Sequence, residues 1–387
     1  MTTILLVVIY IAFISLGLPD SILGSAWPVM YEGINVSISW VGILSMIIAG
    51  GTIVSSFFSA KVIHKLGTGL VTAISVGMTA IALIGFSFSS TFWQLCLWAI
   101  PYGIGAGSVD AAINNFVALH YRSRHMSWLH CFWGVGATVG PYIMGLCLSN
   151  HFGWYAGYQT IGMLQIILVI VIFLSLPLWK MKQQGHEEEI PGKALNLKAV
   201  LSLPGAAHIF IAFFAYGAVE TTAGLWASSY MVLYRGIHAE TAAKWASIFY
   251  LGITIGRFVC GFITEKFGDK LMIRLGQSII VVGILLMLMP AGQAILFMGF
   301  ILIGLGCAPI YPSIIHQTPY IFGKENSQAV IGIQMASAYI GTTFMPPVFG
   351  VLAQWLGVTL YSWYLLIFTL LMIVMVEQCN RRKGNIA

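Results

Sequence analysis

GLPDSILGSAWPVMY, residues 17–31, ends an apolar run that begins at Ile4 and is long enough to cross a lipid bilayer. This run carries a single carboxylate, Asp20. Charged side chains are costly in the hydrocarbon layer of a membrane, and those that occur there usually serve a function. The stretch therefore predicts a membrane-spanning helix with a functional acid inside it.

The composition of the whole chain is that of a polytopic membrane protein. Of its 387 residues, 59% are hydrophobic and only 8% are charged. Helices are expected, because lipid offers no hydrogen-bond partners to open strand edges and the alternation typical of membrane barrels is absent. We predict an all-α membrane protein with twelve transmembrane helices, at 4–30, 38–60, 69–88, 91–119, 126–149, 155–179, 203–233, 242–263, 271–290, 292–317, 328–353 and 359–378.

Most of the basic residues fall on alternate connections between the expected spans. The exceptions are Arg235 and Lys244 on the opposite side and Arg257 inside a span. By the positive-inside rule, both termini are expected in the cytoplasm of a multi-pass cell (inner or plasma) membrane protein. The net charge of +6 is then a topological signal, and no nucleic-acid partner is expected beside the lipid bilayer. The six cysteines show no C-x-x-C spacing, so we expect no metal site and no cofactor.

Internal repetition divides the chain into two parallel halves. The opening stretch aligns with GAVETTAGLWASSYM (217–231) at an offset of 200, which places Asp20 on Glu220. Further along, AKVIHKLG (60–67) aligns with GFITEKFG (261–268) at nearly the same offset. Parallel repeats of this kind are one common architecture of secondary transporters. We therefore expect an N-terminal half at 1–179, a cytoplasmic linker at 180–200 and a C-terminal half at 201–387.

Ionisable residues recur in the middle of every third expected span. They are Asp20 in the first span, Asp110 in the fourth, Glu220 in the seventh and His316 in the tenth. This interval matches the three-helix units nested within each half of such transporters, whose equivalent members face one central cavity. For Asp20 and Asp110 the alternative to a functional role is a structural contact with a polar group of a neighbouring helix.

Further side chains suited to a binding site lie in some of these spans and in the fifth. Asn114 shares a helical face with Asp110, together with glycines that suit close helix packing. His130 and Trp133 share a face in the next span, where an imidazole can bond sugar hydroxyls and an indole can stack on a sugar ring. The alternative for His130 is a structural bond to a backbone carbonyl. Trp27 and Trp226 are expected to contact substrate or to lie in the interfacial belt.

The loops that follow the second and eighth spans resemble the signature of the major facilitator superfamily. That signature reads Gly, three residues, acid, base, any residue, Gly and a basic pair. The second copy starts at Gly261 and matches it well, whereas the first copy is degraded. The resemblance implies the twelve-helix major facilitator fold and a conformational, gating role for these loop residues: His64, Lys65 and Gly67 in the first copy, and Glu265, Lys266, Gly268, Asp269 and Lys270 in the second.

Within that superfamily, VDAAINNFV (109–117) resembles the corresponding helix of fucose:proton symporters. The resemblance implies a proton-coupling carboxylate at Asp110 and a substrate-linked or coupling carboxylate at Asp20. The chain departs from the family in having Asp where the symporters have Glu, and in its additional acid Glu220. We therefore expect proton-coupled symport of a hexose-like sugar by alternating access, with sodium left open as the coupling ion. Glu220 is a third candidate for coupling, and the expected substrate-binding residues are Asp20, Trp27, Asn114, His130, Trp133, Glu220, Trp226 and His316.

An opposite direction of transport is the alternative. The stretch GATVGP (136–141) is similar to the G-x-x-x-G-P motif of proton antiporters that export drugs, which indicates a proton-driven efflux antiporter for drugs or sugars. An enzyme is not expected, because the sequence has no H-E-x-x-H, no G-x-S-x-G and no nucleotide-binding loop.

The expected topology can be tested by labelling single cysteines. A cysteine placed at residue 186 or 383 should react with a membrane-impermeant maleimide only after the membrane is opened, because both positions are expected in the cytoplasm. Reaction at either position in intact cells would contradict the topology.

Overall fold

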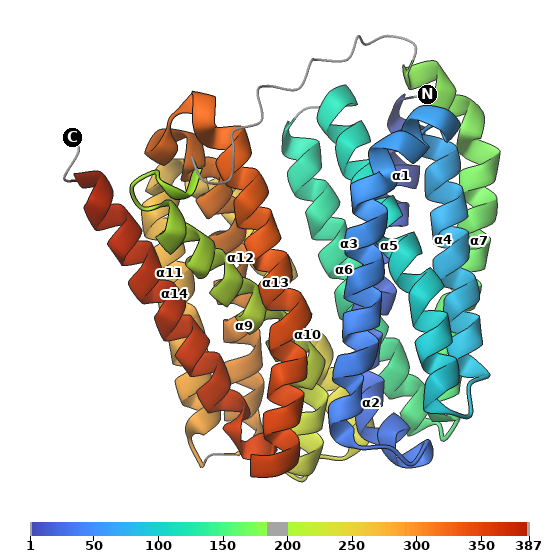
Figure 1. The fold of residues 1–387 in the computed structure, drawn as a ribbon. Coiled ribbons are helices and arrows are strands. Elements are labelled where there is room, and N and C mark those ends of the chain that lie inside the picture. The colour runs from blue at the N-terminus through green and yellow to red at the C-terminus, as the bar shows by residue number, and fades with distance from the viewer. Residues whose placement is uncertain (1, 122, 184–199, 291, 385–387) are drawn as a thin grey trace.

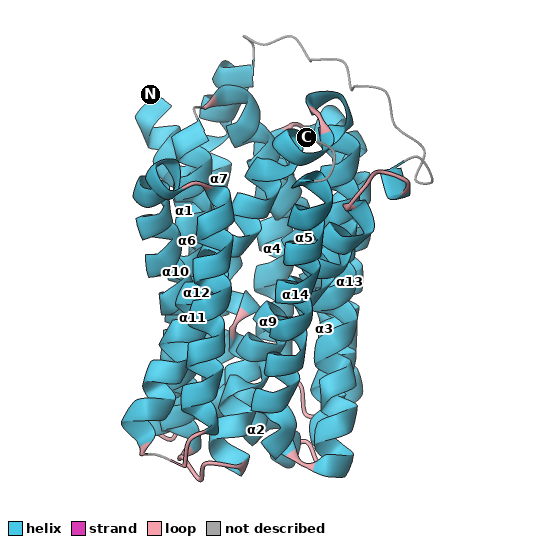
Figure 2. Cartoon of the chain, turned by 90° about the vertical axis from the view of Figure 1, so that its left-hand side faces the viewer, coloured by secondary structure: helices cyan, strands magenta, loops and turns pink. Residues whose placement is uncertain are grey.

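The computed structural model describes residues 2–121, 123–183, 200–290 and 292–384. In that part of the chain, twelve helices are long and apolar enough to cross a membrane, which confirms the all-helical prediction (Figure 2). Most of the expected linker, residues 184–199, lies outside the described residues. The first half contains α1 (Thr2–Asp20), α2 (Ile22–Gly33), α3 (Val41–Leu66), α4 (Thr68–Ser87), α5 (Phe92–His120), α6 (Ser123–Ser149) and α7 (Gly153–Gln183). The second contains α9 (Ala206–Leu233), α10 (Ala239–Phe267), α11 (Asp269–Leu288), α12 (Gln293–Phe322), α13 (Lys324–Leu356) and α14 (Tyr361–Gly384).

The two halves stand side by side. Figure 1 shows their ribbons close together at the end opposite the termini and diverging toward the end that carries both termini. Helices α6 and α10 pack against each other across the boundary, and so do α3 and α13. Gly134 of α6 faces Thr254 of α10, and Gly42 of α3 faces Pro347 of α13, at distances that leave no room for a β-carbon. The missing side chains therefore permit the close approach of the halves.

Side-chain hydrogen bonds also join the halves toward the end opposite the termini. Lys244 donates to the Ser149 hydroxyl at 2.7 Å, and Ser39 donates to Gln354 at 2.6 Å. These two bonds tie α10 to α6, and the 3-10 turn before α3 (Ile38–Trp40) to α13. The structure is therefore held closed at this end.

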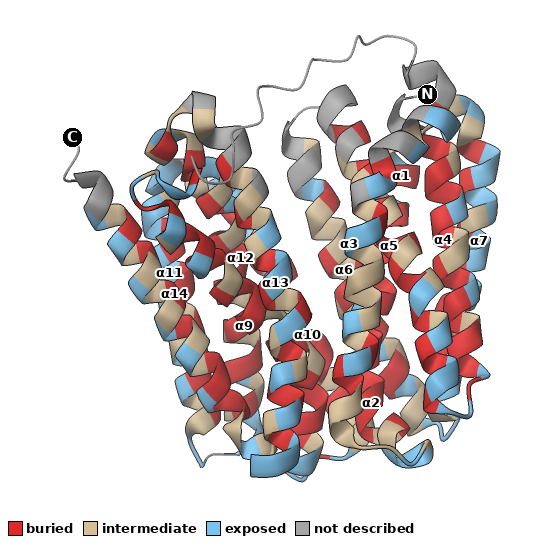
Figure 3. Ribbon diagram, viewed as in Figure 1, coloured by how far each residue is buried: buried red, intermediate tan, exposed pale blue. Residues whose placement is uncertain are grey.

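The outer faces of the helices are apolar. Large side chains such as Ile81, Trp93 and Leu174 are exposed there, while the red, buried residues of Figure 3 line the interior of each half. An exposed apolar girdle around the whole bundle is typical of a protein surrounded by lipid.

The first membrane span is broken near its middle. Helix α1 ends at Asp20, and α2 begins at Ile22 after a turn at Ser21. Pro19 lies in the last turn of α1, where its ring removes a backbone N–H and disfavours continuation of the helix. The break leaves Asp20 at a helix end inside the protein.

The loops after α3 and α10 adopt the same backbone conformation. Gly67 has φ 78° and ψ 152°, and Gly268 has φ 75° and ψ 153°. Each caps its helix by donating its N–H to a carbonyl four residues back, at 2.8 Å in both cases. The alignment of Gly67 with Gly268 in sequence is thus matched by equal geometry, in a region of φ and ψ that only glycine adopts readily.

Replacing either of these glycines by alanine should destabilise the protein. Each of Gly67→Ala and Gly268→Ala should cost about 1–3 kcal/mol through backbone strain, which would lower the unfolding temperature in detergent. Gly261 offers a matched control, because it lies within α10 and nothing would contact an added β-carbon. Gly261→Ala should leave the unfolding temperature unchanged or raise it. Equal behaviour of all three variants would contradict this account.

Candidate functional site

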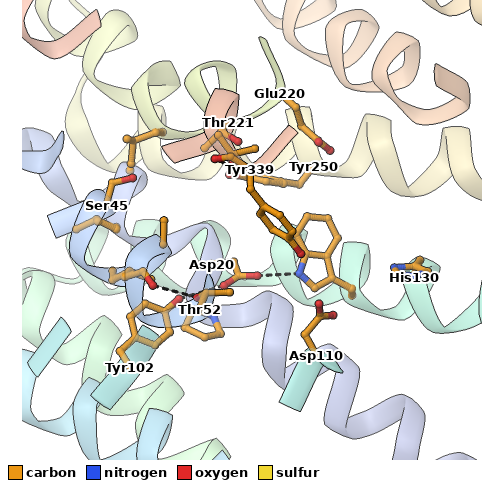
Figure 4. Close-up of a pocket in the computed structure, with 18 of the residues that line it drawn as sticks. Asp20, Ser45, Thr52, Tyr102, Asp110, His130, Glu220, Thr221, Tyr250 and Tyr339 are labelled. Atoms are coloured by element: carbon orange, nitrogen blue, oxygen red, sulfur yellow. Dashed lines mark hydrogen bonds between the residues drawn. The ribbon is translucent and has the colours of Figure 1, made fainter. Parts of the chain in front are cut away.

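A cavity of about 420 Å³ lies between the two halves. Figure 4 shows Asp20 near its centre, with Tyr102 and Asp110 on one side and Glu220, Thr221, Tyr250 and Tyr339 on the other. Its walls come from both halves: Phe13, Pro19, Asp20, Leu23, Gly24, Ser45, Ile48, Ala49, Thr52, Tyr102, Asp110, His130 and Trp133 from the first, and Glu220, Thr221, Leu225, Tyr250, Arg257, Tyr311, Tyr339 and Thr342 from the second.

Asp20 faces this cavity and accepts two hydrogen bonds. The indole Nε1–H of Trp133 donates to Oδ2 at 2.8 Å, and the Tyr102 hydroxyl donates to Oδ1 at 3.1 Å. Both donors are electrically neutral, and they come from α6 and α5. The carboxylate is therefore held in place by hydrogen bonds, with the cavity providing access to solvent or substrate.

Glu220 lies across the cavity and pairs with the guanidinium of Arg257 at 3.4 Å. The same guanidinium lies 5.3 Å from the centre of the Trp133 ring, within the range of a cation–π interaction. Trp133 belongs to α6 and Arg257 to α10, so this contact joins the two halves. A continuous series of contacts thus runs from Asp20 through Trp133 and Arg257 to Glu220.

Asp110 lies one turn before Asn114 on α5. The Asn114 amide donates to the Asp110 carboxylate at 2.8 Å and to its backbone carbonyl at 3.0 Å. Asp110 lines the cavity, and Asn114 orients its carboxylate from outside the lining. His130 also lines the cavity, with its ring edge-on to Phe13 at 5.7 Å.

Two of the expected tryptophans lie away from this cavity. Trp27 is fully buried and donates its indole N–H to the Ile38 carbonyl at 2.8 Å. Trp226 is also fully buried and donates to the Pro346 carbonyl at 3.1 Å. Neither indole reaches the cavity, so the expected contact of Trp27 and Trp226 with substrate is not seen, whereas Leu23 and Gly24, on the turn of α2 that follows Asp20, do line it.

The structure also corrects the position of His316. Its Nδ1 lies 2.7 Å from the Asp269 carboxylate, and 70% of its side chain is exposed. Helix α12 continues to Phe322, so His316 lies near the end that carries the termini, and Tyr311 reaches the cavity in its place. The tenth span therefore contributes a phenol to the site.

The expected gating residues gather at the same end of the molecule. Lys65, Lys266 and Lys270 are exposed, and Asp269 begins α11, where its contact with His316 ties α11 to α12. The side chains of His64 and Glu265 lie outside the described part of the chain. Their gating role stays a prediction.

Several residues of the cavity received no role from the sequence. Arg257 is visible there as a charge inside a span, which is by itself a signal for a functional residue. Tyr102, Tyr250, Tyr311 and Tyr339 give no comparable signal, because tyrosines are frequent in membrane proteins both as anchors and in cores. Within the described residues, no cluster of three or more His, Cys, Asp and Glu side chains could hold a metal ion.

Comparison with known proteins relates the chain to membrane transporters. A family model described as Major Facilitator Superfamily matches residues 9–245 and 209–378. The glucose/mannose transporter GlcP of Bacillus subtilis (strain 168) is 22% identical over 339 residues, covering 86% of this chain and 84% of that protein. The sodium-dependent glucose transporter 1 of Homo sapiens is 24% identical over 388 residues, covering 88% and 72%.

Solved structures share the fold. A mutant of the nucleoside transporter NupG has a TM-score of 0.78 at 16% identity, covering 97% of this chain and 98% of that one. A bacterial homologue of the human lysosomal transporter Spinster, inward-facing and unoccupied, has a TM-score of 0.71 at 12% identity, covering 99% and 95%. At these identities the likeness concerns the fold alone.

The ion pair between Glu220 and Arg257 can be tested by a double-mutant cycle on thermal stability. Removing one partner leaves the other charge unpaired, which costs about 3–5 kcal/mol when burial is complete. Because 20% and 17% of the two side chains are exposed, solvent screens the remaining charge, and we expect about 1 kcal/mol for each of Glu220→Gln and Arg257→Met. The double variant should be more stable than the sum of the single changes implies. Additive effects would mean that the two side chains do not interact.

Proposed function

Because the chain belongs to the Major Facilitator Superfamily of membrane transporters, we propose that it imports a hexose-like sugar together with a proton by alternating access. One observation carries the proposal: Asp20, Asp110 and Glu220, from the first, fourth and seventh spans, line a single cavity between the two halves. Its volume of about 420 Å³ lies toward the small end of the ~300–1,000 Å³ typical of small-molecule pockets.

The chemistry of the walls supports a sugar as substrate. Hydroxyl groups of tyrosine, threonine and serine come from both halves, and the carboxylates can accept hydrogen bonds from sugar hydroxyls. The Trp133 ring offers an apolar face for stacking on a pyranose ring. Two of the relatives are named as glucose transporters, which favours a hexose over other polyhydroxylated compounds.

The partners of the three acids differ in a way that bears on proton coupling. Asp110 and Asp20 accept hydrogen bonds from neutral groups of the described residues, so protonation leaves no cation without a partner. Protonation of Glu220 would leave the Arg257 guanidinium unpaired. We therefore assign the transported proton to Asp110 or Asp20, and to Glu220 the role of counter-ion for Arg257.

The proposed cycle uses this difference in charge. A proton taken up from outside neutralises Asp110 or Asp20, which removes the cost of enclosing that charge while the halves move. The proposed cycle places both termini in the cytoplasm, and on that orientation the end at which the ribbons of the two halves diverge faces inward, toward the side where sugar and proton would be released. Export has weaker support, because close helix packing alone accounts for the small residues of the antiporter-like motif. Gly136 and Gly140 lie against the carbonyls of Ile14 and Leu18 in α1.

Transport assays in proteoliposomes test this proposal. A panel of labelled hexoses, with a nucleoside and a drug-like cation for comparison, is offered under an inward proton gradient, an inward sodium gradient or neither. We expect accumulation of a hexose under the proton gradient alone. Accumulation driven only by sodium would identify sodium, and not the proton, as the coupling ion. Hexose efflux, or no movement of hexose, would refute the proposal.

Asp110→Asn should separate coupling from transport. An asparagine cannot carry the proton, so the proton gradient should no longer drive sugar accumulation, and uptake should fall to the level seen without a proton gradient. Exchange of sugar between the two sides of the membrane should persist. Glu32→Gln provides the same chemical change at an exposed position near the end of α2 and should transport normally. Full accumulation by Asp110→Asn would move the coupling role to Asp20.

A further inference from the structure

The break in the first span leaves a backbone carbonyl without its helical partner. In a regular helix the N–H of residue 19 would donate to the carbonyl of Ser15, but Pro19 has no N–H. A buried carbonyl without a donor costs free energy comparable to a lost hydrogen bond. Something must therefore satisfy Ser15 if the break, and with it the position of Asp20, is to be stable.

Gln165 of α7 supplies the missing donor. Its side-chain amide donates to the Ser15 carbonyl at 2.7 Å, and only 1% of the residue is exposed. The Thr79 hydroxyl of α4 lies 2.8 Å from the amide oxygen of Gln165. Because the Ser15 carbonyl can only accept a hydrogen bond, the amide nitrogen of Gln165 must lie toward it and the amide oxygen toward Thr79, whose hydroxyl is also 2.8 Å from the Val76 carbonyl. The bond connects α7 to α1 at Ser15, four residues before Pro19 and five before Asp20.

Neither Gln165 nor Thr79 lines the cavity. Figure 1 shows α4 and α7 on the side of the first half that faces away from α9 to α14. A substrate in the cavity would therefore contact neither residue. Any effect of Gln165 on the site must act through the backbone of α1.

We propose that Gln165 is a positioning residue for Asp20: it replaces the backbone donor that Pro19 removes, and so holds the broken end of α1 with the carboxylate toward Trp133 and Tyr102. The inference depends on the proposed function only where transport is the measurement. It adds to that function a residue that binds neither sugar nor proton and still sets how both are bound.

The test is a double-mutant cycle between Gln165 and Pro19. Gln165→Leu keeps a side chain of similar size but removes the donor, while Pro19→Ala restores the backbone N–H to Ser15. Gln277→Leu serves as a control, because Gln277 of α11 is also buried, at 2% exposed, and its amide nitrogen has no hydrogen-bond partner among the described residues. The first measurement is amide hydrogen exchange over residues 15–24 without substrate, and the second is the KM and pH dependence of sugar uptake.

With Pro19 present, Gln165→Leu should raise exchange over this segment roughly 5- to 30-fold, raise the KM and shift the pH profile of uptake. In the Pro19→Ala background the same change should have little effect, and Gln277→Leu should leave the segment unaffected. The inference is overturned if Gln165→Leu leaves both exchange and KM as in the wild type, or if its effect is equally large in the Pro19→Ala background. Absence of sugar uptake by the wild type would refute the proposed function instead, while the exchange measurement would still decide the role of Gln165.

Discussion

A charge inside a membrane needs a partner or access to water, and this constraint organises the centre of the protein. Insertion of a carboxylate or guanidinium at the centre of a bilayer costs about 2.5–3.5 kcal/mol. Asp20, Asp110, Glu220 and Arg257 all avoid the lipid by facing one cavity between the halves. Each also has a hydrogen-bond or ion-pair partner: two neutral donors for Asp20, an amide for Asp110, and each other for Glu220 and Arg257.

These interactions connect charge to conformation because one of them crosses between the halves. Arg257 pairs with Glu220 within the second half, and its guanidinium also lies over Trp133 of the first. Trp133 in turn holds Asp20. A movement of one half relative to the other must alter the contact between Arg257 and Trp133. The relative free energies of the conformations before and after that movement therefore depend on the charges of Glu220 and Asp20, at the two ends of this series of contacts. A substrate that displaces Trp133 from Arg257 or from Asp20 would change the same difference in free energy between the conformations.

Much of the fold could be predicted from the sequence, because it follows from hydropathy and repetition. Twelve apolar segments correspond to twelve candidate spans of the described residues, the first of them broken into α1 and α2, and the alignment of Gly67 with Gly268 corresponds to two glycines of equal backbone conformation. The gathering of Asp20, Asp110 and Glu220 was also predictable, since charges in a membrane must face inward. Their roles in coupling are still a proposal.

Other features of the site depend on geometry that spacing does not reveal. Trp27 was expected to contact substrate or to lie in the interfacial belt, but its indole is fully buried and donates to the Ile38 carbonyl. His316 was assigned to the cavity because it continued the series of ionisable residues in every third span, but it lies near the end of α12 and contacts Asp269. Gln165 could not be found at all from sequence, because its partner is a backbone carbonyl 150 residues away.

The central claim, that this cavity couples a proton to a sugar, is tested most directly by proton movement caused by the sugar itself. Proteoliposomes in weak buffer, without any imposed gradient, receive the transported hexose from outside while the external pH is recorded. The account predicts a transient rise in external pH, because protons enter with the sugar. Entry of the labelled sugar with no change in pH would contradict it.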